Sequence, residues 1–215
     1  MTICTEKRAC LFGGIYNETM RLNKSGTIIH TCWNNIPKHF VLARLDTYVI
    51  MPNHIHGVII ITERDCDSRG EAFSTHDELY HGSISENASP LHSHPMNQPH
   101  GTPSGSLGAI MQNFKSVSTR KINASNNTTG VTLWQRNYYE HIVRNENSLN
   151  TIRRYIMYNP LIWAYDMDNP DRYHVSEAEM KHEIKKRCNF TNDELDFVIN
   201  YDIKYRMGHN NGDNK

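Results

Sequence analysis

The pattern of apolar and polar positions predicts two neighbouring strands early in the chain. The segments "LDTYVI" (45–50) and "HIHGVIIIT" (54–62) are rich in β-branched residues, and the turn-prone "MPN" joins them. Residues 2–5 read as the end of a further strand whose beginning is missing, as if the chain were truncated at its start. We therefore expect a sheet built from the first 62 residues.

Helical spacing of apolar residues occurs on both sides of these strands. In "NKSGTIIHTCWNNIPKHF" the apolar residues recur with the period of a helix, and we expect Pro37 to end it. A second stripe lies in "SLGAIMQNFKSVSTRKIN". This stripe consists of Leu107, Ile110, Met111, Phe114 and Val117. The sequence thus predicts one helix before the strand pair and one well after it.

A short, aromatic and basic segment follows the second helix. "TLWQRNYYEHIVRN" (132–145) is predicted to be a strand or an extended loop. "SLNTIRRYIMYNP" then predicts a helix, with Ser148 as its N-cap and an end at Asn159-Pro160.

Two regions differ from this pattern. Ser, His, Pro, Asn and acidic residues dominate residues 63–105, which predicts a flexible polar insertion rather than a core element. Residues 167–215 predict a helical C-terminal extension. Ser176 suits the N-cap of one helix, and Thr191 and Glu194 have the spacing of a capping box in another. Packing onto the core and onto a partner are both open roles for this extension.

The net charge is zero, but the charges are unevenly distributed. Residues 107–160 carry seven Lys or Arg against two Asp or Glu, whereas residues 63–106 carry two against seven. The basic block also holds Trp134, Tyr138, Tyr139 and Tyr155. A basic, aromatic segment suits a polyanion with stackable bases, although a solvated helix face would show the same charges.

Cysteine usage and hydropathy indicate the cytoplasm. The number of cysteines, five, is odd, and no two of them have CxxC spacing. Neither a disulfide framework nor a thiolate zinc site is therefore predicted. Free thiols suit a reducing compartment. The sequence shows neither a signal peptide nor an apolar run long enough to span a bilayer. We expect a cytoplasmic protein without a membrane partner.

Candidate chemistry begins with two histidines in the second strand. Residues i and i+2 of a strand face the same way, so His54 and His56 project side by side. Two neutral imidazoles in this arrangement can bind a divalent metal. Two structural histidines in a buried strand are the alternative interpretation.

A tyrosine and an asparagine can complete this site. A helix turns about 100° per residue, so Tyr155 and Asn159 lie together at one edge of the apolar stripe of their helix, whereas Tyr158 points roughly the opposite way. Each has a plain alternative, Tyr155 as an amphipathic edge residue and Asn159 as the last helical residue before a proline. Together with the histidines and the basic block, they suit DNA strand transfer.

In that chemistry, a tyrosine hydroxyl attacks a backbone phosphodiester and forms a 5′-phosphotyrosine, leaving a free 3′-OH. A metal acts as a Lewis acid on the phosphoryl oxygens. Basic residues bind the DNA backbone and aromatic residues stack on unpaired bases.

Three segments resemble the REP-associated tyrosine transposases, a branch of the HUH (histidine, bulky hydrophobic, histidine) single-strand transposases. They are "VIMPNHIHGVIII", "IMQNFKSVSTRKIN" and "LWQRNYYEHIVRNENSLNTIRRYIMYNPLIWAYD". The resemblance covers roughly residues 2–62 and 106–166. It implies an α+β fold with a ferredoxin-like (RRM-like) antiparallel sheet and helices packed on it. Residues 1–62 and 106–166 would form the catalytic domain, with the insertion and the extension added to it.

The resemblance also implies an activity: a Mg²⁺- or Mn²⁺-dependent enzyme that cleaves and rejoins single-stranded DNA near hairpins, as a monomer or a homodimer. His54 and His56 match the metal ligands of the family. Tyr155 matches the nucleophile, and Asn159 matches the polar residue that completes the metal site. From charge and position alone, we add four candidate DNA contacts. These are Lys115, Arg120, Arg136 and Arg144.

Two other functions are compatible with the same residues. The chain could be a catalytically inactive or domesticated remnant of a mobile element that still binds hairpin DNA. It could also be a metal-dependent hydrolase with a water nucleophile, which would need carboxylates near the metal. Replacement of Tyr155 by Phe distinguishes the hydrolase from the transposase. The hydrolase would keep most of its activity in this variant, whereas the transposase would lose it.

Overall fold

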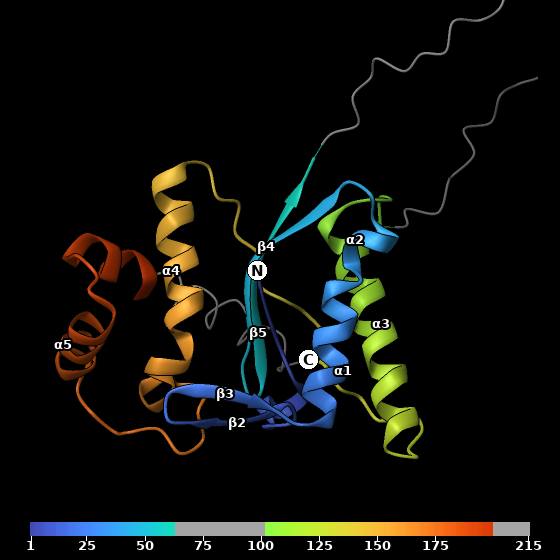
Figure 1. Cartoon of the computed structure of the whole chain (residues 1–215), viewed down its shortest axis with the longest axis horizontal. Coiled ribbons are helices and arrows are strands. Elements are labelled where there is room, and N and C mark those ends of the chain that lie inside the picture. The colour runs from blue at the N-terminus through green and yellow to red at the C-terminus, as the bar shows by residue number, and fades with distance from the viewer. Residues whose placement is uncertain (63–101, 200–215) are drawn as a thin grey trace, which may run out of the picture.

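The computed structural model describes residues 1–62 and 102–199. Within these residues the protein has a mixed α/β fold, with an antiparallel sheet between two layers of helices (Figure 1). The predicted insertion, residues 63–105, lies almost wholly outside the described residues, as does the end of the chain from residue 200. The mixed class with an antiparallel sheet agrees with the prediction.

The predicted strand pair forms the centre of the sheet. β4 (Ala43–Ile50) and β5 (His54–Ile61) are antiparallel neighbours, and β1 (Thr2–Cys4) pairs with the other side of β5. Isolated bridges from Thr2 to Tyr139 and from Thr5 to Trp134 place the segment 134–139 beside β1. The segment predicted to be a strand or an extended loop therefore runs along the edge of the sheet.

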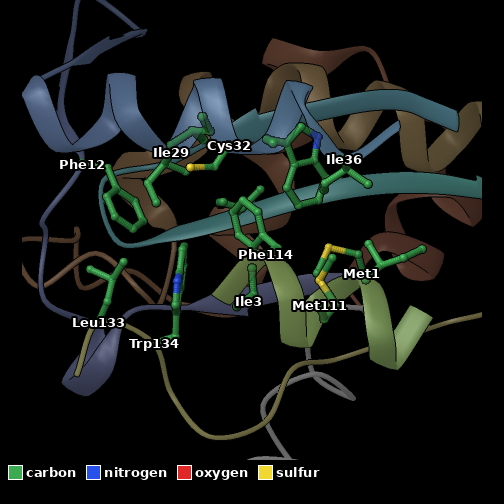
Figure 2. Packing of buried hydrophobic residues seen from close by; sticks show 14 of the residues in the cluster. Met1, Ile3, Phe12, Ile29, Cys32, Ile36, Met111, Phe114, Leu133 and Trp134 are labelled. Atoms are coloured by element: carbon green, nitrogen blue, oxygen red, sulfur yellow. The ribbon is translucent and has the colours of Figure 1, made fainter. Parts of the chain in front are cut away.

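One face of the sheet is covered by α1 (Lys24–Asn34), the short α2 (Ile36–His39) and α3 (Leu107–Ser125). The prediction that Pro37 ends the first helix is wrong. The helix stops earlier, at Asn34, and Pro37 lies in the first turn of α2, where its missing N–H is no loss. The packing between this layer and the sheet is mainly apolar (Figure 2). Its members include Ile3, Phe12, Ile29, Trp33, Ile55, Met111, Phe114 and Trp134.

A hairpin that the sequence analysis did not predict precedes α1. Its strands are β2 (Gly13–Tyr16) and β3 (Thr19–Leu22), and a 3₁₀ turn, η1 (Glu6–Arg8), links it to β1. The two turn residues, Asn17 and Glu18, both have left-handed φ values of 48° and 61°. This conformation matches a two-residue hairpin turn of type I′, which is usually made with glycine.

The opposite face of the sheet is covered by α4 (Glu146–Ile162). Both of its predicted ends were wrong. Asn145 is the N-cap, and its side chain accepts a hydrogen bond from the amide of Ser148 at 2.8 Å. The helix also continues past Pro160 to Ile162. Because only two helical residues follow Pro160, the backbone bond that it cannot donate is lost in the final turn alone.

The tail packs onto α4, on the side away from the sheet (Figure 1). A 3₁₀ turn, η2 (Trp163–Tyr165), leads to α5 (Glu177–Cys188) and to a helix over 192–199. Both predicted N-caps are confirmed. Ser176 forms a capping box with Glu179, and Thr191 exchanges the same pair of bonds with Glu194. Apolar residues of α4, α5 and 192–199 form a second core cluster.

Candidate functional site

Two buried histidines lie next to each other on the face of β5 that α4 covers. His54 is 0% exposed and His56 is 3% exposed. Their ring centroids are 4.5 Å apart. The residues between and after them, Ile55 and Gly57, face the other way, and a Cβ on Gly57 would come within 2.5 Å of the Trp33 indole. The strand therefore presents apolar groups to one layer and the two imidazoles to the other.

Each histidine has a polar partner at Nδ1. His54 Nδ1 is 2.9 Å from Oδ1 of Asn53, and His56 Nδ1 is 2.7 Å from the hydroxyl of Thr2 on β1. Such contacts fix the orientation of an imidazole ring and are typical of metal-binding histidines. Because both contacts use Nδ1, metal binding at this pair would use the Nε2 atoms.

Tyr155 of α4 lies directly against the pair. Its ring centroid is 5.3 Å from that of His56, and the side chain is 4% exposed. A cavity of about 480 Å³ opens beside it, between α4 and the tail. The wall of this cavity includes Tyr165, Arg172 and Tyr173. Tyr158, by contrast, is half-buried on another side of α4, where its ring faces Phe190 at 6.2 Å.

Asn159 lies one helical turn after Tyr155 and is 0% exposed. Within residues 1–62 and 102–199, neither Oδ1 nor Nδ2 of this amide has a hydrogen-bond partner. An unsatisfied buried polar group costs about 1–3 kcal/mol, so a ligand that bonds to this amide would be stabilising. Neutral imidazoles bind divalent metals through a ring nitrogen, and an amide oxygen, with water or phosphate oxygens added, is the kind of ligand that Mg²⁺ and Mn²⁺ accept. The residues present thus fit a metal site.

Two arginines beside Tyr155 hold α4 in place. Arg153 donates to both carboxylate oxygens of Asp46 on β4, at 2.9 and 2.6 Å. Arg154 faces the tail, where it donates to Glu194 at 2.6 Å and to two backbone carbonyls. The helix that carries Tyr155 is therefore tied to the sheet on one side and to the tail on the other.

Carboxylates are scarce around the histidines. In the part of the chain that the structure describes, no group of three or more His, Cys, Asp or Glu side chains could hold a metal ion. Asp168 is the acidic neighbour that the coordinates place near His54, with Oδ2 3.9 Å from Nδ1, and its carboxylate forms an ion pair with Arg8. Sequence reasoning missed Asp168, Arg8 and Asn53. Only Asn53, next to His54 in the "MPNH" turn, could have been noticed.

The candidate DNA contacts are not gathered in one place. Lys115 on α3 donates from Nζ to the carbonyls of Gln135, Arg136 and Asn137 at 2.6, 2.8 and 3.1 Å. Burial lowers the pKa of Lys115 to about 8, and it anchors the edge segment 134–139. These bonds occupy the ammonium group in the structure.

Three candidate arginines are exposed. Arg136 lies in the edge segment, and Arg120 lies on α3, on the face of the sheet opposite to α4. Arg144 lines a groove of about 700 Å³ that also includes Ile60 and Ile142 and runs to the start of α4. The structure therefore places Tyr155 against His56, which lies beside His54, and Asn159 one helical turn further along α4, but it leaves these arginines dispersed.

Comparison with known proteins identifies the class of protein. A family model described as "Transposase IS200 like" matches residues 84–159, a range that includes Tyr155 and Asn159 and begins after the two histidines. An "Uncharacterized protein" of Haemophilus influenzae (strain Rd) is 38% identical over 166 residues, which cover 77% of this chain and 81% of the relative. No solved structure matches. Residues 84–159 of the chain are thus similar to an IS200-like transposase domain.

A transposase domain implies an enzyme that binds and cleaves DNA. Among the helices of the described residues, none has the length and apolarity needed to span a membrane.

Proposed function

We propose that the protein cleaves and rejoins single-stranded DNA during transposition, with Tyr155 as the nucleophile and a divalent metal beside it. The observation that carries this proposal is the position of Tyr155. Its ring packs 5.3 Å from His56, and Asn159, with its unpartnered buried amide, follows one helical turn later. This arrangement is what a tyrosine nucleophile and a phosphate-orienting metal require.

The order of elements supports the narrower assignment to REP-associated HUH transposases with a ferredoxin-like sheet. Apart from the hairpin β2–β3 and the short elements η1 and α2, the order is strand, helix, strand, strand, helix and edge segment: β1, α1, β4, β5, α3 and 134–139. The edge segment returns beside β1, and β5 lies between β1 and β4. This topology puts the histidine pair on a central strand and leaves one face of the sheet for α4.

The proposed reaction proceeds in two steps of the same kind. The Tyr155 hydroxyl attacks a backbone phosphorus, the bond from phosphorus to O3′ breaks, and the tyrosyl proton is transferred to O3′. The products are a 5′-phosphotyrosine and a free 3′-OH. Attack of a 3′-OH on the phosphotyrosine then rejoins DNA and regenerates Tyr155.

His54, His56 and Asn159 would hold Mg²⁺ or Mn²⁺ in this proposal. When bound, the metal would supply Lewis-acid stabilisation of the phosphoryl oxygens. The chain itself supplies position: the Arg153–Asp46 pair fixes α4 against β4, so the Tyr155 ring stays against His56.

The DNA path is proposed from the exposed charges. Arg144 and the apolar side chains of its groove would contact the backbone and the bases of a single strand, and Arg136 would contact the same strand from the edge segment. Arg120 lies on the other face and would contact only a longer, hairpin-containing DNA. Lys115 would act on DNA indirectly, by holding the segment that carries Arg136.

A covalent-adduct assay tests the proposal. The protein would be mixed with labelled single-stranded hairpin DNA from the sequence that flanks its gene, with Mn²⁺ or Mg²⁺, and run on a denaturing gel. We expect a metal-dependent, SDS-stable protein–DNA band that is absent in Tyr155→Phe and in His54→Ala. Tyr158→Phe is the matched control, because it removes a hydroxyl from the same helix away from the histidines, and it should keep the band.

Other outcomes identify the competing functions. Hairpin binding in a gel shift without any adduct would indicate a catalytically inactive DNA-binding protein. Metal-dependent cleavage that survives Tyr155→Phe would indicate a hydrolase with a water nucleophile. Either result would overturn the tyrosine mechanism.

A further inference from the structure

Asn53 lies directly behind His54 and has all its polar atoms engaged. The side chain is 0% exposed. Its Nδ2 donates one hydrogen bond to the carbonyl of Arg8 at 2.9 Å and another to the carbonyl of Asp168 at 2.7 Å. A carbonyl can only accept, so these two bonds assign the NH₂ group to that side of the amide. Oδ1 is therefore the atom that faces His54.

This assignment determines which nitrogen of His54 carries hydrogen. Oδ1 of Asn53 can only accept a hydrogen bond, and it lies 2.9 Å from Nδ1 of His54. Nδ1 is thus the protonated nitrogen of the neutral ring, and Nε2 carries the lone pair. A metal binds the nitrogen with the lone pair, so Asn53 selects the tautomer that can coordinate at Nε2.

The two residues whose carbonyls accept hydrogen bonds from Asn53 are joined to each other by an ion pair. The carboxylate of Asp168 and the guanidinium of Arg8 are paired, and the Asp168 side chain is 3% exposed. The same two residues supply the carbonyls that accept from Asn53. Arg8 adopts a left-handed φ of 53°, which costs free energy in a residue other than glycine and is found where a conformation is enforced by its surroundings.

These contacts join three segments that are far apart in the sequence. Arg8 belongs to η1, Asn53 to the turn between β4 and β5, and Asp168 to the segment after α4. The amide of Asp168 is in turn bonded to the Asp166 carboxylate at 2.7 Å. A simple brace between loops would need no polar group aimed at a histidine, but here the chain of bonds ends on the ring of His54.

We propose that Arg8, Asn53 and Asp168 are positioning residues that hold His54 in its metal-binding tautomer. Asn53 acts on the ring, and the ion pair between Arg8 and the buried Asp168 keeps Asn53 in place. The site would thus be completed by a residue from beyond residue 166, outside the segments that the motifs define. This inference rests on the proposed metal site at His54, His56 and Asn159.

Metal affinity without DNA is the first test. Binding of Mn²⁺ to the full chain would be measured by electron paramagnetic resonance in the wild type and in Asp168→Asn, which keeps the shape and the backbone carbonyl but removes the charge. We expect a 10- to 100-fold weaker affinity, the usual effect of losing such a supporting contact. Asp171→Asn, an exposed change three residues further on, should leave the affinity unchanged.

The opposite partner gives a rescue experiment. Arg8→Met should weaken Mn²⁺ binding as Asp168→Asn does, whereas Arg8→Lys keeps a positive charge and should restore most of the affinity. Affinities within twofold of the wild type in both Asp168→Asn and Arg8→Met would overturn the proposal.

The tautomer of His54 provides a readout that needs neither metal nor activity. With ¹⁵N-labelled histidine at pH 8, the signal of His54, assigned by its loss in His54→Gln, should show hydrogen on Nδ1 in the wild type. In Asn53→Ala, which leaves the ion pair intact, it should shift toward hydrogen on Nε2, while the signal of His56 stays unchanged. This second variant decides the question if Asp168→Asn does not fold, and an unchanged His54 tautomer would refute the role of Asn53.

The two hypotheses fail in different ways. A wild type that binds no Mn²⁺ would contradict the proposed metal site, and the tautomer measurement would still show whether Asn53 controls His54. A wild type that binds Mn²⁺, with variants that bind it equally well, would contradict only the positioning role.

Discussion

At residues 54–57 both faces of β5 are buried, but the two faces differ in chemistry. Toward α1 and α3 the strand presents Ile55 and Gly57, which pack with Trp33 and Phe114 in an apolar layer (Figure 2). Toward α4 it presents His54 and His56 (0% and 3% exposed). Strand geometry alone separates the two sets, because successive side chains point to opposite faces.

This difference separates the residues of β5 that stabilise the fold from those that could take part in chemistry. Burial of polar groups is unfavourable unless they are hydrogen-bonded, and an all-apolar strand would pack between the two helix layers without that requirement. The α4 face nevertheless collects Thr2, Asn53, Asp168 and Asn159 around the histidines. We infer that the apolar face maintains the sheet, whereas the polar face is retained for its chemistry.

The largest effect on stability is expected from the apolar face. Trp33 is 0% exposed and meets Phe114 edge-on, with ring centroids 5.3 Å apart. Trp33→Ala should therefore lower the free energy of unfolding by about 4 kcal/mol, measured by urea denaturation. Met157→Ala, at an exposed position of α4, should change it by about 0.5 kcal/mol or less. Equal losses in the two variants would contradict the assignment of the core.

An intermediate effect is expected when metal is added to the polar face. Mn²⁺ at about 100 times its dissociation constant should stabilise the wild type by about 2.7 kcal/mol, because it binds the folded state alone. Thermal denaturation should show this shift in Trp33→Phe as well, but not in Asn159→Ala. A shift that persists in Asn159→Ala would place metal binding elsewhere in the chain.

The smallest effect is expected at the contact that orients α4 on the sheet. The hydrogen bonds from Arg153 lower the pKa of Asp46 well below its ordinary value. A carboxylate with a lowered pKa in the folded state stabilises the protein above the unfolded value of about 4, and this contribution is lost as the pH falls below it.

Asp46→Asn should therefore lower the melting temperature at pH 7 by on the order of 2 °C. The difference from the wild type should shrink between pH 5 and pH 3, as followed by thermal scans at each pH. A difference that grows in acid would show that Asp46 does not act through its charge.

Much of the fold could be predicted because its signals are local. The β-branched run around His54 is typical of a strand, and the apolar stripe from Leu107 to Val117 has the period of a helix. The structure has both elements, as β5 and α3. The errors were also local. Ser148 is a residue type that suits an N-cap, but Asn145 suits it as well and takes that position in the structure. Pro160 is typical of a helix end, but it also fits the last turn of a helix that ends two residues later.

Only those parts of the site that residue types and their spacing indicate could be predicted from the sequence. The strand period places His54 and His56 on one face of β5, the helix period places Tyr155 and Asn159 on one side of α4, and in the structure the ring of Tyr155 lies against that of His56. The contact from Asp168 to Asn53 joins residues 115 positions apart, and no period or motif in the sequence specifies it. Lys115 shows the same limit, because its charge suggested DNA whereas its ammonium group is bonded to backbone carbonyls.

The most direct test of the central claim is to locate the atom that becomes joined to DNA. The adduct formed with labelled hairpin DNA and Mn²⁺ would be digested with protease and nuclease, and the modified peptide would be sequenced by mass spectrometry. The account predicts a nucleotide attached through its 5′ phosphate to Tyr155. Attachment to Tyr138, Tyr139 or Tyr158, or cleaved DNA with no attached peptide, would contradict it.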